Sequence, residues 1–258
     1  LAGLVPGLLM AVMFAGFSWF QANAHGETVG QDWAGTREVL RALRKSIWAV
    51  LMPPVVLGGI YLGVFTAGEA AAVGAVYALL VALLAYRNVS FADLVDCAWQ
   101  TLRTSAMLFM IIAAAALLGH AVTIIRLPAQ LMEGVTALGL SQTGFIFAVM
   151  LTIFLLGMFL ETIAIILITT PIILPVLIAL HIDPVWYGVM LMINLELALI
   201  TPPVGMNLFV IKGVTGAPLT DIMRGAAPYV ALLLAGLAII WAFPELSLWL
   251  PRTAGFGG

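Results

Sequence analysis

The sequence contains two apolar stretches that are too long for a single membrane crossing and carry almost no charge. Residues 46–86 include one formal charge, Glu69, and residues 141–180 include one, Glu161. A helix needs about 20 apolar residues to cross a bilayer, so each stretch has room for two helices. The whole chain is 64% hydrophobic and 9% charged, whereas soluble domains are about half apolar and about one-quarter charged. The sequence therefore predicts an all-α integral membrane protein, a polytopic helical bundle.

Charge and missing motifs exclude several classes of function. Ten Lys and Arg against twelve Asp and Glu give a net charge of −2, and nucleic-acid binding needs a basic face. The lone Cys97 cannot form an internal disulfide, a thiolate zinc cage or a CxxC pair. The histidines His25, His120 and His181 lie on different segments, and no HExxH, GxSxG or phosphate-loop motif occurs. We therefore expect no enzymatic activity, no cofactor and no nucleic-acid partner.

Apolar runs and the segments between them divide the chain into three predicted parts. Residues 1–45 are expected to hold a first transmembrane helix and, in the sequence TREVLRALRKS, a basic interfacial arm helix. Residues 46–125 are expected to hold scaffold-type transmembrane helices, with a break near 63–69. A second amphipathic arm is predicted over 88–103, leading into a span over 104–125.

The third part, residues 126–258, is predicted to be the transport-type part. Its apolar run over 141–180 is expected to form either a re-entrant helical hairpin or a pair of full crossings, with its tip at 157–162. A broken transmembrane helix is predicted over 184–211, and a final transmembrane helix over 226–243.

Basic residues predict how these helices are oriented, because cytoplasmic loops carry an excess of Lys and Arg. Eight basic residues fall on one side: Arg37, Arg41, Arg44, Lys45, Arg87, Arg103, Lys212 and Arg224. The opposite side has only Arg126 and Arg252. The first side is therefore expected to be cytoplasmic.

Three carboxylates lie far from any predicted water surface: Glu69, Glu161 and Glu196. An acidic side chain at the bilayer centre costs about 3 kcal/mol on insertion scales, so such residues usually face a cavity or a partner. Glu161 is the strongest functional candidate, because it lies at the predicted hairpin tip. The alternative is that each carboxylate only caps a helix.

The hairpin tip could bind ions through its backbone. Glu161 and Thr162 open an apolar helix, where polar side chains often act as an N-cap. A tip inside the membrane would also leave carbonyls at the end of its first helix and amides at the start of its second. Such carbonyls suit a sodium ion, and such amides suit a substrate carboxylate.

The sequence ITPPVGMN predicts a second break. Pro202 and Pro203 cannot donate hydrogen bonds and clash with the preceding turn, so the helix must stop there. Unwound backbone at membrane depth is tolerated only where it is buried in protein or lines a watery cavity. A simple proline kink is the alternative, but Thr201, Gly205 and Asn207 beside the prolines favour a binding role.

At these same residues the sequence resembles the large membrane (M) subunit of tripartite ATP-independent periplasmic (TRAP) transporters. The matching segments are GGIYLGVFTAGEAAAVGAVYALL from Gly58, GMFLETIAIILITTPIILPV from Gly157, IDPVWYGVMLMINLELALITPPVGMNLFV from Ile182 and FPELSLWLP from Phe243. A common family form of the first motif is FTPTEAAAV, and this chain has Ala67 and Gly68 in place of its Pro-Thr. That departure alters only the turn before Glu69.

The resemblance implies an elevator-type, ion-coupled transporter built from two inverted repeats, of which this chain looks like the second, C-terminal one. It implies that substrate or ion is bound by Gly157, Glu161, Thr162, Thr201, Pro202, Pro203, Gly205 and Asn207. Sodium would be held through Thr162, Thr201, Gly205 and Asn207, with Glu69, Asn194 and Glu196 as possible supporting residues. The interfacial arm would brace the moving domain.

The leading hypothesis is therefore a multi-pass permease component of the bacterial inner membrane that imports an organic anion with sodium. The resemblance implies a C4-dicarboxylate, sialic acid or a related carboxylate as substrate. It also implies three protein partners: a periplasmic substrate-binding protein, the small membrane (Q) subunit and the missing first repeat. The alternative is a structural membrane subunit of a larger complex without its own ion site.

Overall fold

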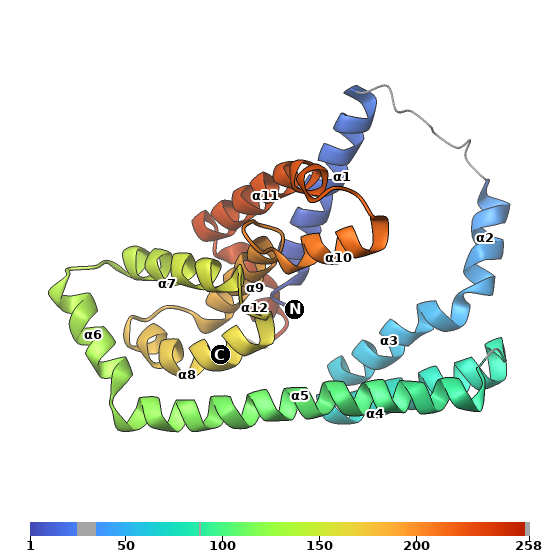
Figure 1. Ribbon diagram of the computed structural model, residues 1–258, viewed down its shortest axis with the longest axis horizontal. Helices are drawn as coiled ribbons and strands as arrows, with labels where there is room; N and C mark the ends of the chain where they lie inside the picture. The colour runs from blue at the N-terminus through green and yellow to red at the C-terminus, as the bar shows by residue number, and fades with distance from the viewer. Residues whose placement is uncertain (25–34, 88, 256–258) are drawn as a thin grey trace. The chain divides into compact units, whose positions relative to one another are not determined.

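Every regular element that the computed structural model describes is a helix (Figure 1). The described residues are 1–24, 35–87 and 89–255, so His25 lies outside them. Two compact units are present: a large unit of residues 1–26 and 108–258, and a small unit of residues 27–107. Each is described by itself below. The predicted all-α class is confirmed.

Five described helical segments are long and apolar enough to cross a membrane. They are α1 (Leu4–Ala24), α4 (Ala67–Leu80) continued by η1 (Val81–Tyr86), α5 (Phe91–Ile124), α8 (Thr162–Ala179) and α11 (Leu219–Ala242). A sixth is possible if α2 (Thr36–Lys45) and α3 (Ile47–Tyr61), which are bent by 66° against each other, form one span. The chain is a multi-pass membrane protein.

In the small unit, α3 and α4 form a tight helical hairpin. The turn between them contains Gly63 in the left-handed region at φ +69°, and the ring of Phe65 occupies the space where Gly59 would carry a Cβ. Further along, the Tyr77 hydroxyl donates a 2.7 Å hydrogen bond to the carbonyl of Trp48. The predicted break near 63–69 thus falls at residues 62–66.

The predicted second arm and the span that follows it share one helix. Residues 91–124 form one uninterrupted helix of 34 residues, α5. At 1.5 Å per residue such a helix is about 51 Å long, well beyond the roughly 30 Å hydrocarbon thickness. Ser90 and Asp93 cap its start reciprocally, with the Ser90 amide donating to the Asp93 carboxylate over 2.8 Å. No helix breaker lies between the amphipathic and apolar segments, so the backbone continues.

The large unit is organised around α9 (Pro184–Leu199), which lies among the other helices of the unit (Figure 1) and packs most closely against five of them. These neighbours are α7 (Gln142–Gly157), α8, α10 (Met206–Thr215), α11 and α12 (Glu245–Thr253). The remaining helix between α5 and α7, α6 (Leu127–Ala137), packs on α8. Seven residues of α9 are buried, more than in any other described helix. This burial fixes α9 as the core of the unit.

Helix α11 lies between α9 and α1 and connects the chain's first helix to that core. The Met10 side chain fills the space over Gly236, and the rings of Phe14 and Phe17 meet Tyr229 edge to face at 5.7 Å. Helix α11 starts at Leu219, seven residues before the predicted start at 226.

Candidate ion and substrate site

The tip of the 141–180 hairpin is a four-residue turn between two apolar helices. Helix α7 ends at Gly157 and α8 begins at Thr162. Glu161 has an extended backbone at the N-cap position, and no side-chain oxygen caps the start of α8. The first amides of a helix have no partner within the helix itself. The N-terminal turn of α8 is therefore an uncapped set of donors, beside the half-buried side chains of Glu161 and Thr162.

The second break separates α9 from α10. Helix α9 ends at Leu199 and α10 begins at Met206. In an unbroken helix the carbonyl of Leu199 would accept a hydrogen bond from the amide of residue 203, but Pro203 has no N–H. The Thr201 hydroxyl donates to the carbonyl of Leu197 at 2.6 Å, so toward any other group its oxygen can only accept hydrogen bonds or bind a cation.

Gly205 gives the break its shape. It adopts φ +54°, a left-handed conformation that glycine enters without steric cost. A Cβ built on Gly205 would lie 3.0 Å from the Thr201 carbonyl oxygen and 3.3 Å from that of Leu199. A methyl group of the buried Leu208 lies closer still, at 2.9 Å, so two backbone oxygens and one apolar side chain surround this glycine. Such a cradle of carbonyls suits a hard cation, which prefers oxygen ligands.

The hairpin tip and the broken helix meet at one point. A Cβ on Gly157 would lie 2.7 Å from the Cβ of Ala198 and 3.6 Å from a methyl group of Leu195. Gly157 is buried, and Ala198 is fully buried. Only glycine allows α7 to end this close to α9. The last residue of the first hairpin helix therefore packs one residue before the end of α9.

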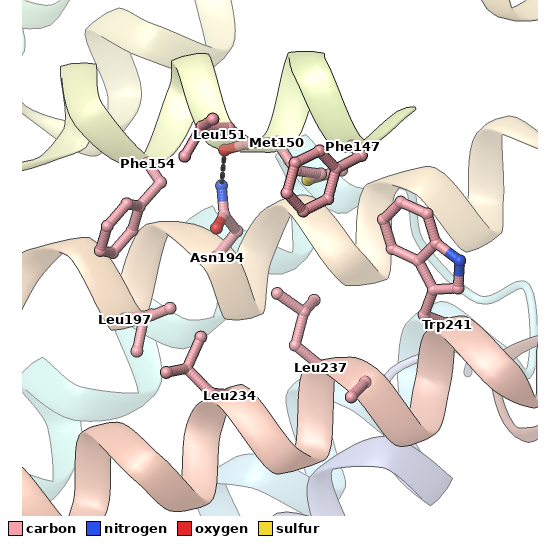
Figure 2. A pocket seen from close by; sticks show the side chains of 10 residues that line it. Phe147, Met150, Leu151, Phe154, Asn194, Leu197, Leu234, Leu237 and Trp241 are labelled. Carbon is pink, nitrogen blue, oxygen red and sulfur yellow. Dashed lines mark hydrogen bonds between the residues drawn. The ribbon is translucent and has the colours of Figure 1, made fainter. Parts of the chain in front are cut away.

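One turn before this contact, a buried amide ties the same two helices together. Figure 2 shows Asn194 of α9 donating from its Nδ2 to the Met150 carbonyl of α7 at 2.9 Å. Asn194 is only 3% exposed and lines an apolar cavity of about 430 Å³ that Leu237 and Trp241 of α11 border from the other side. The amide thus holds α7 against α9 and has no hydrogen bond to the break itself.

A second cavity, of about 440 Å³, opens directly beside the break. Ile200, Thr201 and Pro202 line it from one side, and Thr220, Met223 and Arg224 of α11 line it from the other. Sequence reasoning used Arg224 only to predict orientation and did not single out Thr220. The signal that could have found this pair is the apolar spacing of α11, because it places Thr220 and Arg224 on one helical face.

The remaining predicted residues are Asn207, Glu196 and Glu69. Asn207 and Glu196 are exposed, on α10 and α9 respectively. Glu69 lies in the small unit, where its carboxylate accepts from the amide and hydroxyl of Thr66 and caps α4. No described hydrogen bond joins Thr162 to Thr201. Among the described residues no three His, Cys, Asp or Glu side chains gather as a metal site, so a cation here depends on backbone and hydroxyl oxygens.

Comparison with known proteins identifies the family. Residues 1–246 match the family described as "Tripartite ATP-independent periplasmic transporter, DctM component". The chain belongs to the DctM family. The resemblance noted from the sequence motifs is therefore confirmed, because the match covers nearly the whole chain.

Curated relatives of this DctM-family chain are named as transporter permeases. The C4-dicarboxylate TRAP transporter large permease protein DctM of Pseudomonas aeruginosa is 40% identical over 99% of this chain and 60% of its own length. The sialic acid TRAP transporter large permease protein SiaM of Vibrio cholerae is 31% identical over 100% of this chain and 60% of its own length. The isethionate TRAP transporter permease protein DctMQ of Oleidesulfovibrio alaskensis is 32% identical over 96% of this chain and 39% of its own length.

Two conclusions follow from these relatives. The chain spans no more than about 60% of the length of these curated relatives. The relatives are named as permease components and not as enzymes, in agreement with the predicted absence of enzymatic activity.

Proposed function

We propose that this chain is the C-terminal repeat of a sodium-coupled permease that imports an organic anion across the bacterial inner membrane. The observation that carries the proposal is the carbonyl cradle at Gly205. It lies in a break between two apolar helices, and unwound backbone inside a membrane persists only where it is buried or lines a cavity. Half-helix ends of this kind coordinate sodium in secondary transporters.

The adjoining hairpin supports the same proposal. The uncapped amides at the start of α8 favour an anionic group, while the carbonyls of Leu199 and Thr201 favour a cation. The contact between Gly157 and Ala198 couples the hairpin tip to the broken helix, so an ion at one break would affect the other. Thr162, Thr201, Gly205 and Asn207 remain the proposed sodium ligands.

The names of the relatives support the substrate class and the partners. Relatives are named for C4-dicarboxylate, sialic acid and 2,3-diketo-L-gulonate transport, and all of these molecules carry carboxylates. A periplasmic binding protein would deliver the substrate, and a small Q subunit and a first repeat would complete the complex. An elevator movement of the large unit's hairpin and broken helix would carry the substrate across.

The sodium part of the proposal can be tested on the purified chain by thermal unfolding. A ligand that binds only the folded state raises the melting temperature, so NaCl should stabilise the protein more than KCl at equal concentration. Gly205→Ala should abolish this difference, because its methyl group would fill the carbonyl cradle.

The matched control is Gly216→Ala. Gly216 is also left-handed, at φ +69°, but a Cβ there meets nothing within 4 Å. In both variants the left-handed backbone strains the alanine by about 1 kcal/mol, but only the methyl group of Gly205→Ala enters the carbonyl cradle. Equal stabilisation by sodium and potassium in the unchanged protein would instead favour the structural-subunit alternative.

A further inference from the structure

The cavity beside the break has a charged side chain that the proposed sodium site does not use. Arg224 lies on α11 and lines the 440 Å³ cavity together with Thr201 and Pro202 of the break. Its side chain is exposed and therefore reachable by a ligand. Arginine within a membrane-spanning helix usually faces a cavity or a partner and marks a pathway for substrate or ions.

Arg224 points from the inner face of its helix. Thr220, Arg224 and Ala227 all line the cavity and follow helical spacing. Val230, which also lines the cavity, packs against the core around Met10 and Leu197. Arg224 therefore lies near the start of α11, on the face that lines the cavity beside the break.

No carboxylate neutralises this arginine within the described residues. The two ion pairs found there join Arg41 to Glu38 and Arg252 to Glu245. Asp221, one turn before Arg224, forms no ion pair with it. The guanidinium therefore offers its donors to the cavity.

The hydroxyl groups around the cavity differ in what they can bind. The Thr201 hydroxyl already donates its proton to the Leu197 carbonyl, so it cannot donate to an anion. The Thr220 hydroxyl has no hydrogen-bond partner among the described residues and keeps its proton available. A planar guanidinium matches a carboxylate with two parallel hydrogen bonds, and a hydroxyl can add a third.

We propose that Arg224 and Thr220 form a carboxylate subsite beside the broken helix, which binds the organic anion during transport. This inference rests on the proposed function. It adds a positively charged side chain to a centre whose proposed cation ligands are backbone and uncharged side-chain oxygens. The cation cradle at Gly205 and the guanidinium of Arg224 would then hold opposite charges on the two sides of Thr201.

The experiment measures uptake against substrate concentration in proteoliposomes that contain the assembled transporter. The probes are succinate and N-acetylneuraminate, chosen because relatives are named for C4-dicarboxylate and sialic acid transport. Arg224→Gln should raise the half-saturating concentration of the accepted probe about tenfold or more, the effect of losing a charge-assisted hydrogen bond. The half-saturating sodium concentration should stay within about twofold. Arg224→Lys should recover part of the lost affinity, because lysine keeps the positive charge but cannot donate two parallel hydrogen bonds to one carboxylate.

Lys212→Gln is the matched control. It removes the same charge from an exposed position on α10 that does not line the cavity. Each variant is first checked for folding by its melting temperature in potassium. If Arg224→Gln does not fold, the half-saturating substrate concentrations of Thr220→Val and Arg224→Lys test the subsite instead. Half-saturating concentrations equal to that of Lys212→Gln would overturn the subsite and leave the proposed function standing. Sodium-driven uptake of neither probe by the unchanged protein would overturn both.

A phospholipid phosphate could satisfy the same guanidinium. The uptake series is therefore repeated in phosphatidylcholine vesicles with and without phosphatidylglycerol. A defect of Arg224→Gln that is the same in both lipids supports the substrate subsite. A defect that appears only with phosphatidylglycerol would assign Arg224 to a lipid headgroup and overturn the proposal.

Discussion

Gly157 and Ala198 lie so close that a Cβ on the glycine would come within 2.7 Å of the alanine methyl carbon. The first residue ends the leading helix of the hairpin, and the second lies one residue before the end of α9. Two chain breaks that are some 40 residues apart in sequence are thereby held together. The predictions below begin from this contact.

Gly157→Ala should destabilise the folded protein by about 1–3 kcal/mol, the usual cost of overpacking a core. The free energy of unfolding in detergent measures the effect. Adding Ala198→Gly to the same chain should restore most of the loss, because it removes the clashing methyl group. Gly188→Ala on α9 is the control, since a Cβ there meets nothing within 4 Å. Equal stability of the Gly157 and Gly188 variants would contradict the contact.

Replacing both Pro202 and Pro203 by Ala should cause a large loss of sodium-driven uptake in the assembled transporter. The two restored amides would let the helix close and withdraw the carbonyl of Leu199 into the ladder. The protein should still insert and fold, because an unbroken helix is readily accepted by a bilayer. Uptake against sodium concentration in proteoliposomes is the measurement.

The control for the proline pair lies in the same chain. Pro53 and Pro54 lie inside the continuous helix α3, so their replacement by Ala should leave the sodium dependence unchanged. Thr201→Val should act more mildly than the double change and raise the half-maximal sodium concentration a few-fold. Unaltered sodium dependence in both Thr201→Val and the Pro202 and Pro203 variant would reduce the break to a packing kink.

Asn194→Asp should destabilise the large unit far more than Asn194→Leu. The aspartate would place a buried charge against the Met150 carbonyl oxygen, at a cost of about 3 kcal/mol or more. The leucine loses a hydrogen bond with a net contribution of about 1 kcal/mol but adds apolar volume to a cavity of about 430 Å³. Thermal unfolding of the two variants gives the comparison, and similar melting temperatures would exclude the Asn194 to Met150 bond.

A cysteine at Thr162 should react with small water-soluble thiol reagents, and sodium should slow the reaction. The side chain is half-buried at the start of α8, where a re-entrant tip would meet water. Exposed Cys97 is first replaced by Ser. Leu155→Cys on the exposed apolar side of α7 is the control and should stay unreactive in the bilayer. If neither cysteine reacts, the 141–180 stretch forms two lipid-buried crossings and not a re-entrant hairpin.

Reporter fusions test the predicted orientation. Fusions after Arg87 and after Gly216 should read as cytoplasmic, and a fusion after His181 should read as periplasmic, because of the bias of basic residues. Gly216 is chosen because it lies between α10 and α11, outside both helices. A periplasmic reading at Arg87 or Gly216 would invalidate the charge count.

Much of the local structure could be predicted from the sequence, but identical signals also gave different outcomes. The double proline at 202–203 lies in a helix break, whereas the double proline at 53–54 lies within α3. The difference is that Gly205 follows the second pair and adopts a left-handed backbone. The predicted second arm and the following span share helix α5, because amphipathic patterning reports the environment of a helix and not its ends.

The sequence by itself determined that the chain is helical and lies in a membrane, and it predicted breaks at 157–162 and 201–205, because backbone hydrogen bonding in hydrocarbon is a local requirement. Only the tertiary structure decided that Gly157 packs on Ala198, that Asn194 binds the α7 backbone and that Arg224 lines the cavity beside Thr201. Helices such as α7 and α8 are apolar on every side, so their sequences do not indicate which face is inside. Packing between residues far apart in the chain makes that choice.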